Sequence, residues 1–153
     1  FGVDVAFYHY GGIRFDEMPS EDISTGMIFG VEPFSSKVYT MVMTGAQIER
    51  MILAKYNDRE NMRESHRLDI FSTEPYVIHL DESGDAMRVE FENLVPEAEY
   101  KVAMGDYMFN NYKDIVCRDL VRTEVLLTDI LMNDLASNTP IDYSNTPIQA
   151  IKR

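Results

Sequence analysis

The fold is decided by residues 37–56, which read KVYTMVMTGAQIERMILAKY and join a strand pattern to a helix start. The first part is rich in β-branched and aromatic side chains, a composition typical of a strand. Thr44 then offers a hydroxyl to the unpaired backbone N–H groups of a helix, and Gln47 is placed to reach back, as in a capping box. The apolar residues that follow have helical spacing, which predicts one buried face: Ile48, Met51, Ile52 and Tyr56.

The same reasoning places the other elements on both sides of this stretch. It predicts strands over 3–8, 76–80, 87–91 and 100–104, and helices over 24–31 and 123–136. Turns or loops are expected at 57–67, 81–85, 138–140 and 145–147, with an extended tail beyond them. The apolar side of the last helix is expected to be Leu126, Leu127, Ile130, Leu131 and Leu135. Strands and helices are intermixed without a regular β-α-β alternation. We therefore expect one α+β domain over 1–153, with a mixed β-sheet and two main helices.

Composition narrows the classes of function. The chain has 153 residues and a formal net charge of -12, which disfavours binding to the nucleic-acid backbone. No apolar run approaches the roughly 20 residues of a membrane span, so none is expected. Cys117 is the only cysteine, which excludes an intramolecular disulfide and a cysteine metal cluster. The chain begins at Phe1 rather than Met, which indicates a processed or trimmed product with no visible signal peptide.

The residues that usually carry catalysis form no convincing group. His9, His66 and His79 are far apart and lack metal-ligand spacing, and Cys117 is interpreted as a small buried residue. The acidic residues around 16–22 and 81–85 lie in loop-like sequence without a neighbouring histidine, which is typical of a solvated surface. We therefore predict no catalytic residue and no metal ligand in this chain.

Three short features could hold a ligand. Gly11-Gly12-Ile13-Arg14 follows a strand, and its glycines permit a tight turn, while Arg14 presents a planar fork of donors suited to phosphate or carboxylate. Pro33-Phe34 follows a helix end. Tyr107, Phe109 and Tyr112 follow the strand at 100–104 and could offer a flat face to a planar ligand. Taken singly, each feature is also typical of a turn, a structural salt bridge or a core aromatic residue.

The order of these features resembles the C-terminal domain of 5′-nucleotidases and related UDP-sugar hydrolases. The resemblance is carried by residues 4–14, 25–34 and 38–52, and more loosely by the segment from Tyr100 to Asn110. It implies a domain that grips the nucleoside end of a nucleotide. Phe34 and Tyr107 match the two aromatic residues that stack the base, and Arg14 matches the arginine on the phosphate or ribose side. The other positions implied to bind substrate are Gly12, His9, Asn110 and Asp114.

The resemblance also says what lies outside the chain. Hydrolysis in the family belongs to an N-terminal metallophosphatase domain with two divalent metal ions, and nothing in this sequence resembles that domain. The helix that opens the family's C-terminal domain is also expected to be missing. We therefore predict a chain that is inactive alone, holds no cofactor, works with a metallophosphatase domain or subunit, and is extracytoplasmic.

Two departures from the family pattern keep a second hypothesis open. His9 stands where the family often has Asn, and the family's Gly-Gly-Asp-Gly loop is replaced by Asn110-Asn-Tyr-Lys-Asp114. The alternative is a degenerate family member that serves as a non-catalytic binding or protein-interaction module.

Overall fold

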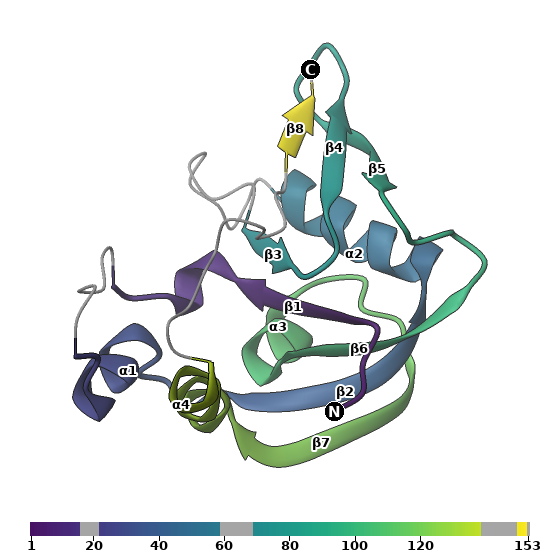
Figure 1. Cartoon of the computed structure of the whole chain (residues 1–153). Coiled ribbons are helices and arrows are strands. Elements are labelled where there is room, and N and C mark those ends of the chain that lie inside the picture. Colours follow the sequence, from purple (N-terminus) through teal and green to yellow (C-terminus); the bar gives the residue numbers. More distant parts are fainter. Residues whose placement is uncertain (16–21, 59–68, 139–149, 153) are drawn as a thin grey trace.

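The computed structural model describes residues 1–15, 22–58, 69–138 and 150–152, the last range for the backbone alone. Two sheets share one hydrophobic core. A five-stranded sheet has the order β3-β1-β6-β2-β7, and a three-stranded sheet has the order β5-β4-β8. Figure 1 shows the smaller sheet above the larger one, with α2 beside both sheets. α1 and α4 lie together at the lower left of the view, away from the smaller sheet. The expected α+β class with a mixed sheet is confirmed.

The strands are β1 (Val5–His9), β2 (Lys37–Thr44), β3 (Ile70–Ser72), β4 (Tyr76–Leu80), β5 (Ala86–Phe91), β6 (Glu99–Gly105), β7 (Arg118–Leu126) and β8 (Ala150–Lys152). The helices are α1 (Thr25–Val31), α2 (Gly45–Asn57), α3 (Asp106–Asn111) and α4 (Leu127–Ser137), with a 3₁₀ turn at Tyr10–Gly12. None of the described helices is long and apolar enough to cross a membrane.

The register of the larger sheet brings distant segments to one edge. β1 runs parallel to β6, so both strands end at the same edge, and β3 begins there because it is antiparallel to β1. His9 pairs with Ile70, and the backbone N–H of Tyr10 donates to the carbonyl oxygen of Asp69 at 2.7 Å. α3 starts directly where β6 stops. This edge therefore gathers residues from around positions 9, 69 and 107.

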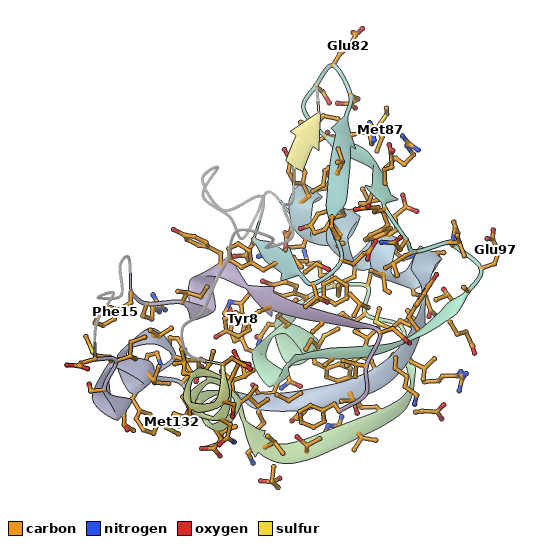
Figure 2. The ribbon with its side chains drawn as sticks, viewed as in Figure 1. Tyr8, Phe15, Glu82, Met87, Glu97 and Met132 are labelled. Carbon is orange, nitrogen blue, oxygen red and sulfur yellow. The ribbon has the colours of Figure 1, made fainter. Side chains whose placement is uncertain are left out.

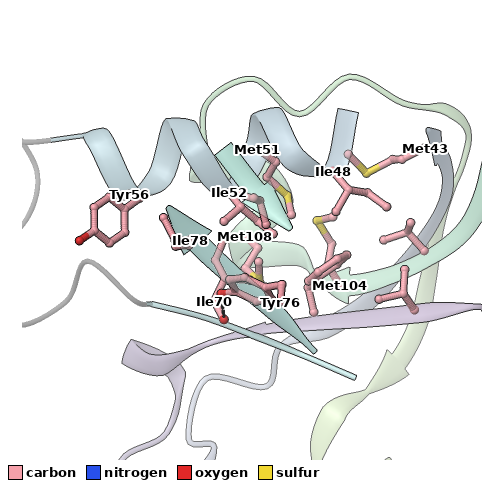
Figure 3. Close-up of a cluster of buried hydrophobic side chains, with 14 of the residues drawn as sticks. Met43, Ile48, Met51, Ile52, Tyr56, Ile70, Tyr76, Ile78, Met104 and Met108 are labelled. Atoms are coloured by element: carbon pink, nitrogen blue, oxygen red, sulfur yellow. Dashed lines mark hydrogen bonds between the residues drawn. The ribbon is translucent and has the colours of Figure 1, made fainter. Parts of the chain in front are cut away.

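The core forms where α2 packs against both sheets (Figure 3). The four apolar residues that the sequence places on the inner face of α2 are all buried. They meet Met43 and Met104 from the larger sheet and Tyr76 and Ile78 from the smaller one. Burial of each large apolar side chain contributes about 1.5–3 kcal/mol, so α2 is the main element that joins the two sheets.

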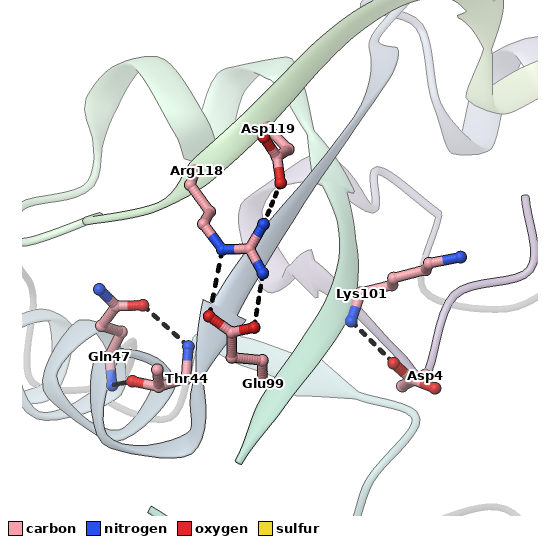
Figure 4. A network of polar contacts seen from close by, with 7 residues as sticks. All are labelled: Asp4, Thr44, Gln47, Glu99, Lys101, Arg118 and Asp119. Carbon is pink, nitrogen blue, oxygen red and sulfur yellow. Dashed lines mark hydrogen bonds and ion pairs between the residues drawn. The ribbon is translucent and has the colours of Figure 1, made fainter. Parts of the chain in front are cut away.

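The start of α2 is closed by the expected capping box. The Thr44 hydroxyl oxygen accepts from the backbone N–H of Gln47 at 3.2 Å, and the Gln47 side-chain oxygen accepts from the backbone N–H of Thr44 at 2.8 Å (Figure 4). Figure 4 also shows Arg118 of β7 bound to Glu99 of β6, across the intervening strand β2.

Replacing Thr44 with alanine is expected to lower the free energy of unfolding by about 1 kcal/mol, because one backbone donor of α2 loses its partner. Urea unfolding followed by circular dichroism measures the change. Thr44→Ser keeps the hydroxyl and should stay close to the original chain. Equal stability of the alanine and serine variants would contradict the role of the cap.

One predicted helix boundary is wrong. The helix expected over 123–136 begins only at Leu127, and residues 118–126 form β7, the edge strand next to β2. The apolar spacing that suggested a helix extends back to Leu126, but the preceding Val121, Thr123 and Val125 are β-branched and belong to the strand that pairs with β2. The short elements β3 and α3 were not predicted.

The remaining predicted elements are confirmed to within two residues at each end. The turn at 81–85 joins β4 and β5 as a hairpin, and the Asp81 carboxylate accepts from the backbone N–H groups of Ser83 and Asp85. Several expectations lie outside the described residues: the acidic residues at 16–21, most of the loop at 57–67 with His66, and the turns at 139–140 and 145–147.

Candidate functional site

A cavity of about 620 Å³ opens at the edge where β1 and β6 end. It is lined by five of the predicted site residues: His9, Arg14, Phe34, Tyr107 and Asn110. The structure thus brings together side chains that are up to 101 positions apart in the sequence, from His9 to Asn110. The cavity is also lined by Gly11 and Tyr112, which belong to two of the short features singled out in the sequence, and by residues that were not singled out: Ser36, Lys55, Asp69, Asp106 and Asn111.

Arg14 and Phe34 form one part of the cavity wall. The Arg14 guanidinium carbon lies 5.0 Å from the centre of the Phe34 ring, and the backbone N–H of Arg14 donates to the carbonyl oxygen of Val31 at 2.9 Å. Phe34 keeps 50% of its surface exposed. Its turn is braced by the buried Glu32 carboxylate, which accepts from the Ser36 hydroxyl at 2.6 Å. This wall therefore offers an exposed aromatic face beside a cation.

A second part of the wall is a group of aromatic rings. The imidazole of His9 stacks on the ring of Tyr107, with ring centres 4.6 Å apart and planes at 28°. Tyr112 stands edge-on to both rings, at 6.5 Å from each. Tyr107 is 51% exposed, so a large part of its ring stays open to the cavity. The position of Tyr107 on α3 follows from the end of β6.

Beside the rings of His9 and Tyr107 lies a polar cluster made of Lys55 on α2, Asp69 directly before β3, and Tyr112 directly after α3. The Tyr112 hydroxyl donates to Oδ2 of Asp69, and Nζ of Lys55 lies 3.3 Å from the same oxygen. Nζ of Lys55 also lies 4.6 Å from the centre of the Tyr112 ring. Burial, together with the hydrogen bond to Asp69, raises the pKa of the Tyr112 hydroxyl. Tyr112 is therefore a fixed donor at any physiological pH.

The pKa of His9 is lowered, mainly because its imidazole is removed from water. The nearby Asp69 carboxylate opposes this shift, while the positive charge of Lys55 adds to it. A lowered pKa leaves the imidazole neutral near pH 7, since the usual value for histidine is about 6.5. His9 therefore supplies one donor and one acceptor to the cavity rather than a charge.

Comparison with known families settles the class of domain. A family model described as 5′-nucleotidase, C-terminal domain, matches residues 1–116. The chain belongs to this family. No curated protein matches the chain.

Solved structures of longer proteins contain the same fold as this 5′-nucleotidase C-terminal domain. The crystal structure of a 5′-nucleotidase precursor from Thermus thermophilus superposes with a TM-score of 0.73 at 22% sequence identity, over 98% of this chain and 32% of that one. The NAD nucleotidase of Haemophilus influenzae gives a TM-score of 0.76 at 13% identity, over 99% of this chain and 30% of that one. A putative 5′-nucleotidase from Staphylococcus aureus, in complex with α-ketoglutarate, gives a TM-score of 0.70 at 14% identity, over 99% of this chain and 34% of that one. The chain spans about a third of the length of these proteins.

Two of the seven predicted residues lie away from the cavity in this 5′-nucleotidase C-terminal domain. Gly12 is buried and lines a second, apolar cavity of about 570 Å³. A Cβ atom at Gly12 would lie 2.3 Å from the Tyr8 hydroxyl oxygen and 2.8 Å from Nε2 of His9, so the glycine leaves room for both rings. Tyr8 lies on the side of β1 that faces α4 (Figure 2). Asp114 is exposed, has a φ of 59° and does not line the cavity.

The residues that the sequence missed had weak signals. Asp69 precedes β3, which the sequence did not reveal, and Lys55 sits in the last turn of α2, where a lysine is ordinary. Tyr112 belonged to the aromatic group that was singled out, but its partner Asp69 was not foreseeable. Only the tertiary pairing of β1 with β3 brings these side chains together.

The described residues include no group of three His, Cys, Asp or Glu side chains that could hold a metal ion. Cys117 is half-buried at the margin of the core, and burial raises the pKa of its thiol. A raised pKa keeps the thiol protonated, which is unlike an activated nucleophile.

Proposed function

We propose that the cavity holds the nucleoside part of a nucleotide, as the substrate-recognition domain of a 5′-nucleotidase-type phosphoester hydrolase. The observation that carries this proposal is the pair of half-exposed rings, Phe34 and Tyr107, which line the same cavity. Aromatic faces of this kind stack on nucleobases, and each stacked base gains about 1–3 kcal/mol. Arg14 lies against Phe34, where its guanidinium can pair with the phosphate or ribose side of the ligand.

The charges of the cavity suit a small ligand. Arg14 and Lys55 are balanced there by Asp69 and Asp106, while the whole chain carries a formal charge of -12. A nucleic-acid polymer would meet the negative surface over its full length, whereas a single nucleotide meets only the local donors. We therefore propose a nucleotide or a nucleoside-like molecule as the ligand.

Hydrolysis itself is proposed to need a metallophosphatase domain or subunit with two divalent metal ions outside this chain. The chain spans about a third of the length of the nucleotidases that share its fold, which leaves room there for such a domain. Metal ions generate the attacking hydroxide and neutralise the developing charge in phosphoryl transfer. The chain alone is expected to bind without turnover, and an extracytoplasmic location is proposed on family resemblance.

Calorimetric titration of the purified chain with adenosine, AMP and a UDP-sugar tests the proposal, with a phosphatase assay in added Mn²⁺ or Zn²⁺ as its second part. We expect at least one of these ligands to bind with a Kd below about 1 mM, a modest affinity for a domain of this kind. We expect no metal-dependent release of phosphate. Turnover by this chain alone would overturn the assignment of the reaction to another domain.

One observation favours a second candidate, a degenerate member that serves as a non-catalytic binding or interaction module. Asn111 and Tyr112 lie in the stretch Asn110–Asp114, which replaces the family's Gly-Gly-Asp-Gly loop, and both are engaged within the chain. The Tyr112 hydroxyl binds Asp69, and the Asn111 amide donates to the carbonyl oxygen of Tyr107 at 2.8 Å. Failure of all three ligands to bind at millimolar concentration would favour this candidate over nucleotide recognition.

A further inference from the structure

Asp69 places a buried carboxylate in the wall of the cavity. Its side chain is only 8% exposed, yet the residue lines the cavity. Tyr112 and Lys55 both contact Oδ2. Among the residues that the structure describes, no group donates a hydrogen bond to Oδ1. Burial of a carboxylate is costly unless its oxygens are paired, so an N–H donor on a bound ligand would find a strong acceptor here.

Lys55 places a donor next to this acceptor. Its side chain is 17% exposed, and Nζ, which lies 3.3 Å from Oδ2 of Asp69 as an ion pair, has three hydrogens to donate. The ring of Tyr112 lies against the same nitrogen and restricts its movement. Lys55 and Asp69 therefore present a donor and an acceptor side by side, held by contacts among three separate elements.

The cavity has different chemistry at its two walls. Arg14 lies against Phe34, whereas Lys55 and Asp69 lie against Tyr112, and Tyr112 contacts His9 and Tyr107. The placement of the ligand that follows rests on the proposed function. Because Arg14, Tyr107, Lys55 and Asp69 line one cavity, we place the sugar and phosphate at Arg14, the base on Tyr107, and the outer edge of the base toward Lys55 and Asp69.

We propose that the Lys55–Asp69 pair selects bases with a lactam edge, in which a ring N–H stands beside a carbonyl oxygen. Hypoxanthine, guanine and uracil have this edge. Their ring N–H donates to Oδ1 of Asp69, and their carbonyl oxygen accepts from Nζ of Lys55. Adenine and cytosine carry a ring nitrogen acceptor beside an amino group. With the base in the same orientation, their ring nitrogen faces the carboxylate and their amino group faces the ammonium, so neither hydrogen bond forms.

The other lining groups do not supply the same pair. The Asp106 carboxylate accepts from the backbone N–H of Tyr107 at 2.8 Å, but no Lys or Arg among the described residues forms an ion pair with it, so it has no donor beside it. Arg14 is a cation without a described carboxylate partner and lies at the opposite wall, against Phe34. His9 is neutral near pH 7 and offers either role, so it does not discriminate between the two edges.

The test compares inosine with adenosine, which differ only in this edge of the base. Calorimetric titration of the unmodified chain should give inosine a Kd at least about tenfold lower, since a good pair of hydrogen bonds discriminates by about that factor or more. Uridine against cytidine is a second pair with the same difference. In Asp69→Asn the amide oxygen still accepts from Tyr112, and its N–H group now faces the base. That variant should lose the preference for inosine and bind adenosine at least as well.

A control variant, Glu97→Gln, removes an exposed carboxylate that does not line the cavity and should keep the preference. Equal affinities for inosine and adenosine in the unmodified chain, or tighter binding of adenosine, would overturn the proposed selectivity and leave nucleoside recognition standing. If the preference persists in Asp69→Asn, the pair does not cause it. If no nucleoside binds, both the selectivity and the proposed function are overturned.

Discussion

Phe34→Ala is expected to raise the Kd for a bound nucleoside about 5- to 150-fold, which corresponds to the loss of one stacking face at about 1–3 kcal/mol. The ring is half exposed in the unliganded chain, so its removal should leave the free energy of unfolding nearly unchanged. Tyr107→Ala is expected to weaken binding by a similar factor. Calorimetric titration of each variant with the tightest-binding nucleoside measures the change.

The matched control is Phe29→Ala. Phe29 lies on α1, is 47% exposed and does not line the cavity. Phe29→Ala therefore removes a ring of similar exposure that does not contact the proposed ligand. Phe34→Tyr keeps an aromatic face and should retain most of the affinity. An unchanged Kd in Phe34→Ala, or an equal loss in Phe29→Ala, would remove Phe34 from the site.

Gly45→Ala is expected to lower the free energy of unfolding by about 2–4 kcal/mol, a large part of the stability of a single domain. Gly45 is the buried first residue of α2. A Cβ atom there would lie 2.2 Å from the carbonyl oxygen of Val95 and 3.1 Å from Cα of Pro96, and backbone atoms cannot move aside as side chains do. The backbone N–H groups of Gly45 and Ala46 also donate to the same loop, at the carbonyl oxygens of Ala98 and Pro96.

The control for this prediction is the same substitution at another helical glycine. Gly26 lies in α1, and the nearest atom to a Cβ there is the Ser24 hydroxyl oxygen at 3.8 Å. Gly26→Ala should be neutral or stabilising by up to about 1 kcal/mol, because alanine favours the helix. Urea unfolding midpoints of both variants give the comparison. A loss of stability that is equal at both positions would show that close packing at Gly45 is not the cause.

Local sequence was enough to predict the elements whose capping residues and apolar spacing lie within the element itself. The capping residues Thr44 and Gln47 and the apolar face of α2 were predicted correctly because each depends on neighbours within one or two helical turns. The start of α4 was predicted too early, since the apolar spacing continues through Leu126 while the β-branched residues before it belong to the strand that pairs with β2. Whether such a segment is a strand depends on an available neighbouring strand, which no local pattern records.

The residues of the candidate site were also predictable only in part from the sequence. Arg14, Phe34 and Tyr107 stand in short motifs, and all three line the cavity. Their binding of a nucleotide stays a prediction. Lys55 and Asp69 became visible only when the register of β1 and β3 and the course of α2 were known. Each is an ordinary charged residue in its own segment. Only their proximity in the folded chain identifies them as a possible ligand-binding pair.

The end of β1 borders two cavities of different polarity. Tyr8 and His9 are neighbours in the chain, yet Tyr8 faces the apolar cavity beside α4 and His9 faces the polar one. Gly12 closes against both rings. A side chain at Gly12 would press on both rings, so it is expected to displace the imidazole of His9 together with Tyr8. The linings of the two cavities are therefore coupled through these two adjacent rings, whose centres lie 5.0 Å apart.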